Sequence, residues 1–176
     1  MANKQLKDSM QEIHFEIIRA LSDFKEENIY YIICSTGARK QYLENLAFDS
    51  GVSNRVIFAG RQEHETAMEL AHAVDVGALP SLIEGLGLSG IEILAAGKPL
   101  IASNVHGIKD YVIDGKTAIL CHPHNIDAFK HAISKMYLDK QFNDSCCNVA
   151  QNKALEFDKN IVRKMMEGDY RDKIRS

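Results

Sequence analysis

Short apolar runs, rich in β-branched and aromatic residues, alternate along this chain with segments of helical periodicity. Strands buried on both faces form nearly continuous apolar runs, whereas a helix shows an apolar stripe that recurs every three or four residues, so the two patterns can be separated. Glycine, proline or small polar residues follow most of the runs. The strand-like runs are residues 29–34, 55–60, 74–80, 99–103 and 118–121.

The helical segments lie between and after these runs. They are residues 12–24, the stretch after the Ser-Thr-Gly of 35–37, 63–73, Leu88 to Ala96, the stretch after Asn125, and 143–173. Asn125 and Asp158 are typical of helix N-caps. Alternation of strands and helices predicts an α/β fold with a doubly wound, mostly parallel, Rossmann-like sheet flanked by helices, in one domain over residues 1–176.

The first strand of such a sheet has no counterpart in the pattern. A doubly wound domain usually opens with a strand, but this chain opens with about ten mostly polar residues and then a helix. Either the sheet lacks its first strand, or residues 1–6 pair poorly in that place.

Composition excludes several functional classes. The 176 residues carry 21 Lys and Arg against 24 Asp and Glu, a net charge of -3, which argues against a nucleic-acid binder. The sequence has neither an apolar run of membrane-spanning length nor an apolar leader core. The four cysteines form no C-x-x-C pair, so we expect reduced thiols and a cytoplasmic protein.

The segment PSLIEGLGLSGIEILAAG, residues 80–97, has the features of a ligand site. Ligands of α/β sheets lie beyond the carboxyl ends of strands, at helix N-termini, where free N–H groups and the helix dipole favour phosphate. Gly85 and Gly87 would let the backbone approach a ligand closely. The structural alternative is that these glycines serve only the turn and that Glu92 is a solvated helix residue.

Two carboxylates flank this turn, Glu84 before the helix and Glu92 within it. Carboxylates repel phosphate but accept hydrogen bonds from hydroxyl groups. A diphosphate between two polyhydroxy rings satisfies both carboxylates and the helix N-terminus. The pattern therefore favours a nucleotide sugar, with one glutamate on the sugar and the other on the ribose.

The sequence EGLGLSGIEILAAGKPLIAS resembles the E-x7-E region of retaining GT-B glycosyltransferases, especially glycosyltransferase family 4. The resemblance continues on both sides and covers about residues 13–170, with capsular and exopolysaccharide enzymes the most similar. It implies half of a GT-B fold, the domain that binds the donor. Such enzymes transfer a hexosyl unit from a nucleotide diphosphate sugar to a saccharide or lipid-linked acceptor, without metal or other cofactor. A UDP-sugar is the first expectation and a GDP-sugar the second.

The resemblance also assigns roles by position. Glu84 would contact the donor sugar as the catalytic residue, and Glu92 would bind the ribose. Val105 to Gly107 would face the sugar, and Gly107 belongs to the donor-binding set. The other residues expected to line the donor are Gly37, Arg61, Gln62, Ser81, Gly85, Leu86, Gly87, Leu88 and Ser89.

Two departures from the family follow. Its members have about twice this length, with an N-terminal domain for the acceptor, so this chain alone is expected to be inactive. The surface that would face that domain can drive homodimer formation.

Family members also place an Arg and a Lys against the diphosphate, but Glu12 stands at the Lys position, and Lys4 and Lys7 do not fit the register. The complete enzyme would work in the cytoplasm, including at the inner face of the membrane.

Three alternatives remain open on the sequence. The chain can be a nucleotide-sugar-binding module without transferase activity, or an epimerase of the UDP-N-acetylglucosamine 2-epimerase type. Cys121, His122 and His124 can form a metal site, although the default interpretation is a strand end followed by a loop, and no metal is predicted.

Overall fold

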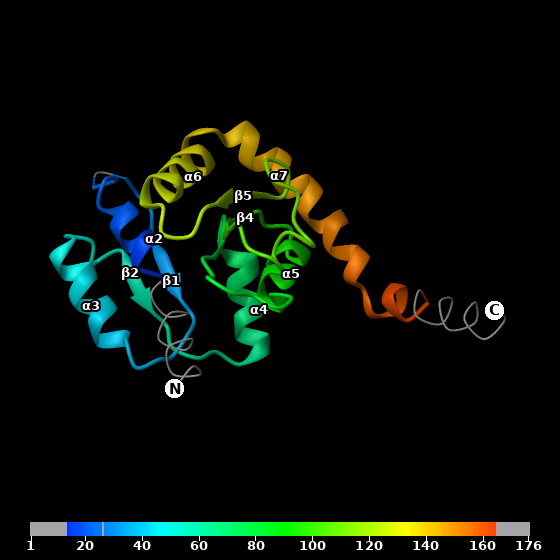
Figure 1. Ribbon diagram of the computed structural model, residues 1–176, viewed down its shortest axis with the longest axis horizontal. Helices are drawn as coiled ribbons and strands as arrows, with labels where there is room; N and C mark the ends of the chain where they lie inside the picture. Colours follow the sequence, from blue (N-terminus) through cyan, green and yellow to red (C-terminus); the bar gives the residue numbers. More distant parts are fainter. Residues whose placement is uncertain (1–13, 26, 165–176) are drawn as a thin grey trace.

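The computed structural model describes residues 14–25 and 27–164 and has an α/β architecture (Figure 1). The strands are β1 (Tyr31–Ile33), β2 (Val56–Phe58), β3 (Gly77–Leu79), β4 (Leu100–Ser103) and β5 (Ala118–Cys121). The helices are α2 (His14–Leu21), α3 (Lys40–Asp49), α4 (His64–Ala73), α5 (Leu88–Ala95), α6 (Ile126–Leu138) and α7 (Lys140–Ala154), followed by the 3-10 turn η1 (Leu155–Phe157). No helix in this part of the chain is long and apolar enough to span a membrane.

The helices form two layers, one on each face of the strands. Helix α2 packs against α3 and α6, while α5 packs against α4 and α7 (Figure 1). Side chains alternate along β4: Ile101 belongs to the core under α2 and α6, whereas Leu100 and Ala102 belong to the core under α5 and α7. This period-two alternation lets one short strand serve both cores. The predicted doubly wound α/β fold is thus confirmed.

Residues 1–6, which the sequence offered as a poorly paired first strand, lie outside the described residues. Within the described residues, the strands form two sheets. The first has the order β1-β2 and the second β3-β4-β5, and every pairing is parallel. In the doubly wound order 3-2-1-4-5-6, the first strand lies at the centre. The break falls at that central position, between β1 and β3. The described strands on either side of the break, β1 and β3, do not pair with each other.

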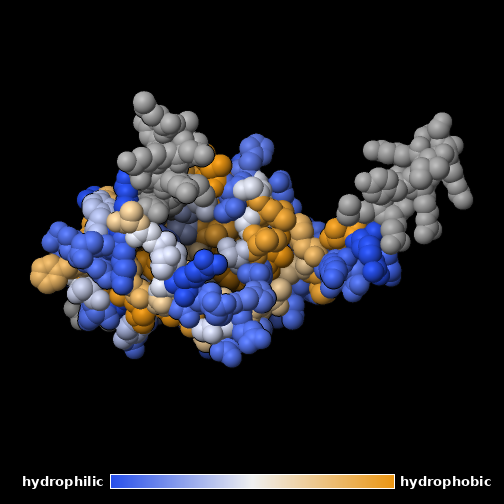
Figure 2. All heavy atoms as spheres, turned by 90° about the horizontal axis from the view of Figure 1, so that it is seen from below, coloured by the Kyte–Doolittle hydropathy of each residue, from blue (hydrophilic) through white to orange (hydrophobic). Residues whose placement is uncertain are grey.

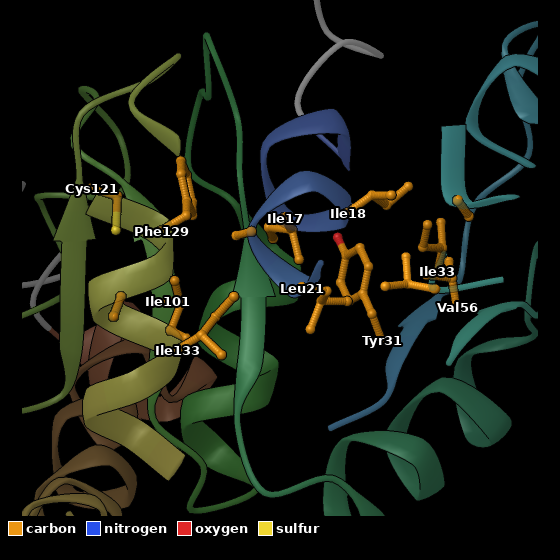
Figure 3. Close-up of a cluster of buried hydrophobic side chains, with 14 of the residues drawn as sticks. Ile17, Ile18, Leu21, Tyr31, Ile33, Val56, Ile101, Cys121, Phe129 and Ile133 are labelled. Atoms are coloured by element: carbon orange, nitrogen blue, oxygen red, sulfur yellow. The ribbon is translucent and has the colours of Figure 1, made fainter. Parts of the chain in front are cut away.

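Helix α2 joins the two sheets through an apolar cluster. Ile17, Ile18 and Leu21 of α2 are buried, and the same cluster contains strand residues from both sheets. These strand residues are Tyr31, Ile33, Val56, Ile101 and Cys121. Figure 3 shows the Tyr31 ring between α2 and the pair formed by Ile33 and Val56. Burial of apolar side chains from both sheets against one helix therefore replaces the hydrogen bonds of a continuous ladder.

A buried arginine fixes the end of α2. Arg55 is only 7% exposed, and its Nη2 donates a hydrogen bond to the Leu21 carbonyl at 3.1 Å. Its Nη1 donates to the carbonyls of Phe24 at 2.6 Å and Glu27 at 3.3 Å. These carbonyls lie at and just after the C-terminus of α2, where acceptors lack helical partners and the dipole favours a cation. Arg55, which directly precedes β2, therefore holds the C-terminus of α2 beside the start of that strand.

The helix ends beyond β5 agree only in part with the expected boundaries. The Asn125 side chain accepts from the Ala128 N–H at 3.0 Å, so the predicted N-cap is confirmed. Asp158 accepts from the Asn160 N–H at 2.8 Å, which confirms a second cap. The helix expected from residue 143 begins at Lys140 instead, because Asp139 caps it by accepting from the Phe142 N–H at 2.9 Å. Residues 165–173 of the predicted helix lie outside the described residues.

Replacement of Arg55 by methionine should destabilise the fold. The substitution keeps an unbranched apolar stem but leaves three carbonyls without their charged donor, so we expect the free energy of unfolding to fall by about 2–4 kcal/mol. Urea unfolding followed by circular dichroism measures this change. Arg61→Met removes an exposed guanidinium and should change the same quantity by less than about 0.5 kcal/mol. Equal losses in the two variants would contradict the assigned role of Arg55.

Candidate functional site

The loops that follow four strands meet at one edge of the molecule. A Cβ atom at Gly60, after β2, would lie 4.0 Å from Thr36, after β1. His64, at the start of α4, approaches Glu92 of α5 at 3.7 Å. A Cβ atom at Gly107, after β4, would fall 2.1 Å from the Gly85 carbonyl oxygen, after β3. The loops after β1 to β4 therefore form one continuous surface, as expected for a ligand site in this type of fold.

Glu84 lies in the loop between β3 and α5, and its carboxylate is held by its own loop. One oxygen accepts from the Ser81 hydroxyl at 3.3 Å, and the other accepts from the Gly85 N–H at 3.1 Å. The bond from Ser81 is long for its type, whereas the bond from Gly85 lies within the usual range. Because an ionised carboxylate accepts about four hydrogen bonds, the group keeps free capacity for the hydroxyls of a ligand. The structure thus brings together the predicted residues Ser81, Glu84 and Gly85.

The glycines before and within α5 have a packing role that the sequence did not reveal. Gly87 is the N-cap of α5 and has φ +67°, a left-handed conformation that glycine adopts without strain. A Cβ atom at Gly87 would lie 2.7 Å from the Tyr111 hydroxyl oxygen, and one at Gly90 only 2.2 Å from it. Gly85 is exposed and has open space around it. Gly87 and Gly90 thus make room for Tyr111, while Gly85 leaves room for a ligand.

Tyr111 lies directly beneath the start of α5. Its side chain is fully buried, and its hydroxyl has no hydrogen-bond partner among the described residues. Burial raises the pKa of this hydroxyl, and the nearby charge of Glu84 raises it further, so the group stays protonated at neutral pH. Sequence analysis did not single out Tyr111, because a tyrosine in the segment IKDYVIDG has the ordinary appearance of a core aromatic.

The loop after β4 touches the loop after β3 through backbone atoms. Gly107 has φ +76°, and its α-carbon faces the carbonyl groups of Glu84 and Gly85 so closely that any Cβ would collide with them. Gly107 is buried, whereas the neighbouring His106 is exposed. The contact determines where the Glu84–Gly85 peptide lies, so Gly107 controls the position of the carboxylate. The 105–107 loop, which was expected to face the sugar, thus borders the Glu84 loop.

Glu92 lies one turn into α5 and faces the start of α4. Its Oε1 is 3.7 Å from His64 Nδ1, and the two side chains are 40% and 73% exposed respectively. His64 is largely exposed and also lies beside Glu92, the residue expected to bind the ribose. It follows Arg61 and Gln62, which were expected to line the donor, and that position is the signal that could have revealed it.

The other residues expected to line the donor lie at different distances from Glu84 and Glu92. Leu88 and Ser89 open α5 and are exposed, like Leu86 and Arg61. The Gln62 side-chain amide donates to the Ala59 carbonyl at 2.6 Å, which leaves its oxygen available. Gly37 lines a hollow of about 190 Å³ beside β1, with Arg39 and Lys40, and the neighbouring Thr36 adjoins Gly60. Lys4, Lys7 and Glu12 lie outside the described residues.

The surface around Glu84 is open and partly apolar. Ile83, Leu86 and Leu88 are 55%, 45% and 65% exposed. Figure 2, which views the molecule from below Figure 1, shows exposed apolar side chains among polar ones on the side that it draws. Such residues at the edge of a site are typical of a surface that receives another domain or a substrate.

The structure does not bring Cys121, His122 and His124 together as metal ligands. Cys121 is buried, and burial together with the charge of Asp114 raises the pKa of its thiol to about 12, so a thiolate is disfavoured. His124 Nδ1 lies 3.0 Å from Glu16 Oε1 on α2. In the described part of the chain, no group of three His, Cys, Asp or Glu side chains could hold a metal ion. The string is the end of β5 followed by a loop.

Comparison with known proteins identifies the class. The family model described as glycosyl transferases group 1 matches residues 10–153, so the chain belongs to this family of glycosyltransferases. It is 29% identical over 141 residues to an uncharacterized glycosyltransferase of Methanocaldococcus jannaschii, covering 80% of this chain and 36% of that protein. It is 32% identical over 107 residues to glycogen synthase of Mycobacterium tuberculosis, covering 61% of this chain and 26% of that protein.

Solved structures show a similar fold. Sucrose-phosphate synthase from Thermosynechococcus elongatus matches with a TM-score of 0.81 and 25% identity, covering 94% of this chain and 43% of that one. HepE from Anabaena, solved in complex with UDP-glucose, has a TM-score of 0.74 at 21% identity, covering 86% of this chain and 44% of that one. The chain therefore spans less than half the length of these relatives.

Replacement of Gly107 by alanine should displace the Glu84–Gly85 peptide. The new Cβ meets backbone rather than a flexible side chain, and alanine is strained at this positive φ, so we expect the free energy of unfolding to fall by about 2 kcal/mol or more. Chemical unfolding measures the loss. Gly85→Ala, which adds the same methyl group to open space, should change stability by less than about 0.5 kcal/mol. A neutral Gly107→Ala variant would show that the close contact does not exist.

Replacement of Tyr111 by phenylalanine should stabilise the protein. It removes a desolvated hydroxyl that has no partner among the described residues, so we expect a gain of about 1 kcal/mol, seen as a rise of roughly 2–4 °C in the thermal midpoint. Tyr31→Phe is the matched control, because the Tyr31 hydroxyl is 2.7 Å from His14 Nδ1, and its removal should lower the midpoint. A lowered midpoint in both variants would mean that the Tyr111 hydroxyl is satisfied.

Proposed function

We propose that this chain is the donor-binding half of a retaining glycosyltransferase and that it binds a nucleotide diphosphate sugar, with UDP-sugar favoured over GDP-sugar. The complete enzyme would transfer a hexosyl unit to a saccharide or lipid-linked acceptor in capsular or exopolysaccharide synthesis. The observation that carries the proposal is the convergence of Glu84, Glu92 and the free N-terminus of α5 on one surface. Family membership and the UDP-glucose bound by HepE support the choice of ligand.

Each part of the donor has a chemically matched group in this arrangement. The N–H groups at the start of α5, with the positive end of the helix dipole, suit the diphosphate. The Glu84 carboxylate, held at the tip of its loop by Ser81, suits the sugar hydroxyls. The Glu92 carboxylate beside His64 suits the two ribose hydroxyls. Gly60, Arg61 and Gln62 at the start of α4 are then near enough to border the base.

The mechanism assigned to these residues is electrostatic and positional. Donors aimed at the leaving diphosphate stabilise the negative charge that grows on it as the glycosidic bond breaks. Glu84 orients the sugar through its hydroxyls, which reduces the entropy cost of reaching the reactive geometry. A second domain would supply the acceptor, so the proposal assigns donor binding to this chain and transfer to the complete protein. No metal or organic cofactor is part of the proposal.

Nucleotide binding should raise the thermal midpoint selectively. At about one hundred times the dissociation constant, a ligand stabilises by about 2.7 kcal/mol, which corresponds to a rise of roughly 5–10 °C for a chain of this size. We expect this shift with UDP and UDP-glucose, and a smaller one with GDP or ADP. Thermal-shift titration of the wild-type chain measures it. No shift with any nucleotide at millimolar concentration would overturn the proposal.

Two variants divide the site into its ribose and sugar parts. Glu92→Gln should weaken UDP and UDP-glucose alike, by roughly tenfold, because both contain the ribose. Glu84→Gln should weaken UDP-glucose while leaving UDP nearly unchanged. Glu69→Gln, an exposed position on α4, serves as the matched control.

Binding without transfer by the complete protein would favour the alternative of a nucleotide-sugar-binding module, and a changed donor sugar without acceptor would favour the epimerase.

A further inference from the structure

The hydroxyl group of Tyr111 is not explained by the packing around it. The side chain is fully buried, and the hydroxyl oxygen has no hydrogen-bond partner among the described residues. Buried tyrosines ordinarily give this group a partner, because a desolvated polar group without one is costly. A phenylalanine would fill nearly the same space without that cost. The hydroxyl therefore points to a state of the molecule in which it has an acceptor.

The hydroxyl lies directly against the first turn of α5. A Cβ atom at Gly87 would lie 2.7 Å from the Tyr111 hydroxyl oxygen, and one at Gly90 would lie 2.2 Å from it. In both cases this oxygen is the nearest atom that the added Cβ would meet. Because the hydroxyl is buried beneath these glycines, a ligand on the surface above α5 does not reach it. An effect of Tyr111 on a ligand must therefore act through a neighbouring group.

Glu84 is the neighbouring group that can accept a hydrogen bond from Tyr111. The Cβ position at Gly87 lies 2.7 Å from the Tyr111 hydroxyl oxygen and 3.0 Å from Glu84 Cγ, so these two atoms are less than 6 Å apart. Each carboxylate oxygen is two bonds from Cγ, and a change of side-chain rotamer turns one of them toward Tyr111. Burial and the charge of Glu84 both raise the pKa of the hydroxyl, so it stays protonated and can donate.

The existing hydrogen bonds of Glu84 permit this exchange. The bond that Oε2 accepts from the Ser81 hydroxyl is 3.3 Å long, beyond the usual range for two oxygens. The bond from the Gly85 N–H goes to the other oxygen, Oε1, at 3.1 Å. Oε2 can therefore leave Ser81 while Oε1 keeps its backbone donor. An ionised carboxylate has about four acceptor sites, so sites remain for the hydroxyls of a ligand.

Tyr111 is held in place while the Glu84 side chain is free to turn. The Tyr111 N–H donates to the Ile108 carbonyl at 3.2 Å, and its ring packs edge-on against Phe157. Gly107, in the same segment, lies against the carbonyl oxygen of Glu84. The side chain of Glu84 is half-exposed, whereas Tyr111 is fully buried. The donor thus has a fixed position relative to the backbone of the loop that carries its acceptor.

We propose that Tyr111 is a positioning residue for Glu84: when a donor sugar binds, one carboxylate oxygen turns from the Ser81 hydroxyl to the Tyr111 hydroxyl, which donates to it. This charge-assisted bond fixes the carboxylate, and its remaining acceptor sites bind the hydroxyls of the sugar. The hydroxyl thus destabilises the free chain and stabilises the sugar-bound one. The inference rests on the proposed function, because it takes Glu84 as the residue that binds the donor sugar.

A comparison of UDP with UDP-glucose tests the inference, because only UDP-glucose contains the sugar. In Tyr111→Phe we expect the dissociation constant of UDP-glucose to rise roughly tenfold and that of UDP to change less than about twofold. Tyr31→Phe is the matched control, because it removes a buried hydroxyl in the other core, and it should leave the ratio of the two constants unchanged. Isothermal titration calorimetry measures the constants, and thermal midpoints recorded in parallel show that each variant is folded.

A double variant separates an effect through Glu84 from an effect on packing. If the hydroxyl acts through the carboxylate, Tyr111→Phe should have no further effect on UDP-glucose binding in a Glu84→Ala background. Additive losses in the double variant overturn the inference. Equal weakening of UDP and UDP-glucose by Tyr111→Phe also overturns it, because packing under α5 would then be the cause. Unchanged binding of UDP-glucose by Tyr111→Phe overturns it as well.

A measurement on the wild-type chain covers the case in which Tyr111→Phe does not fold. The NMR resonance of a tyrosine ζ carbon responds to hydrogen bonding of its hydroxyl. The Tyr111 resonance, assigned through its ring protons, should therefore move on addition of UDP-glucose and stay in place with UDP. A resonance that does not move with UDP-glucose overturns the inference.

Failure of the inference can be distinguished from failure of the proposed function. A wild-type chain that binds neither UDP nor UDP-glucose defeats the proposed function, and the role of Tyr111 fails with it. A wild-type chain that binds both, together with a Tyr111→Phe variant that binds both equally well, leaves donor binding in place and defeats the role of Tyr111 alone.

Discussion

The packing of helix α2 across two separate sheets is the constraint on which the rest of the structure depends. Its apolar face buries Ile17, Ile18 and Leu21 against residues of both sheets, and its C-terminus is held by three hydrogen bonds from Arg55. Apolar burial is non-directional, whereas the arginine bonds have defined geometry, so the first supplies most of the stabilisation and the second sets the position. Without this helix, no described strand pairing would hold β1 and β2 beside β3, β4 and β5.

That arrangement has a direct consequence for the candidate site. Glu84 and Gly107 belong to the second sheet, while Gly60 and His64 follow a strand of the first. The site is therefore assembled only if both sheets keep their relative positions. The approach of His64 to Glu92 at 3.7 Å is where this assembly is visible.

The glycines around Glu84 illustrate how packing and ligand binding share one segment. Gly87 and Gly90 are required because Tyr111 fills the space beneath them, and Gly107 is required because a backbone carbonyl lies opposite it. Gly85, by contrast, faces open space. A strand-to-helix loop that lies this close to neighbouring atoms on one side can present its N–H groups on the other, which is the arrangement that anion recognition requires. The desolvated Tyr111 hydroxyl is a local cost of this construction.

Much of the fold was predictable because local patterns determine it. The five apolar runs became strands within a few residues of the expected bounds, and the caps at Asn125 and Asp158 form as predicted. The family and the E-x7-E segment could also be identified from the sequence, since both depend on residues close together along the chain. The approach of His64 to Glu92 and the place of Tyr111 under Gly90 were not, because they join positions separated by more than twenty residues.

By itself, the sequence determined the alternation of strands and helices, the parallel direction of the strands and the loop that contains Glu84. Each of these follows from periodicity, β-branched composition or turn residues, which act over a few neighbouring positions. Only the tertiary structure decided that α2 joins the two described sheets and which glycines serve packing rather than a ligand. Those outcomes depend on distances between side chains and backbone atoms brought together by the burial of two cores, and no local pattern encodes such distances.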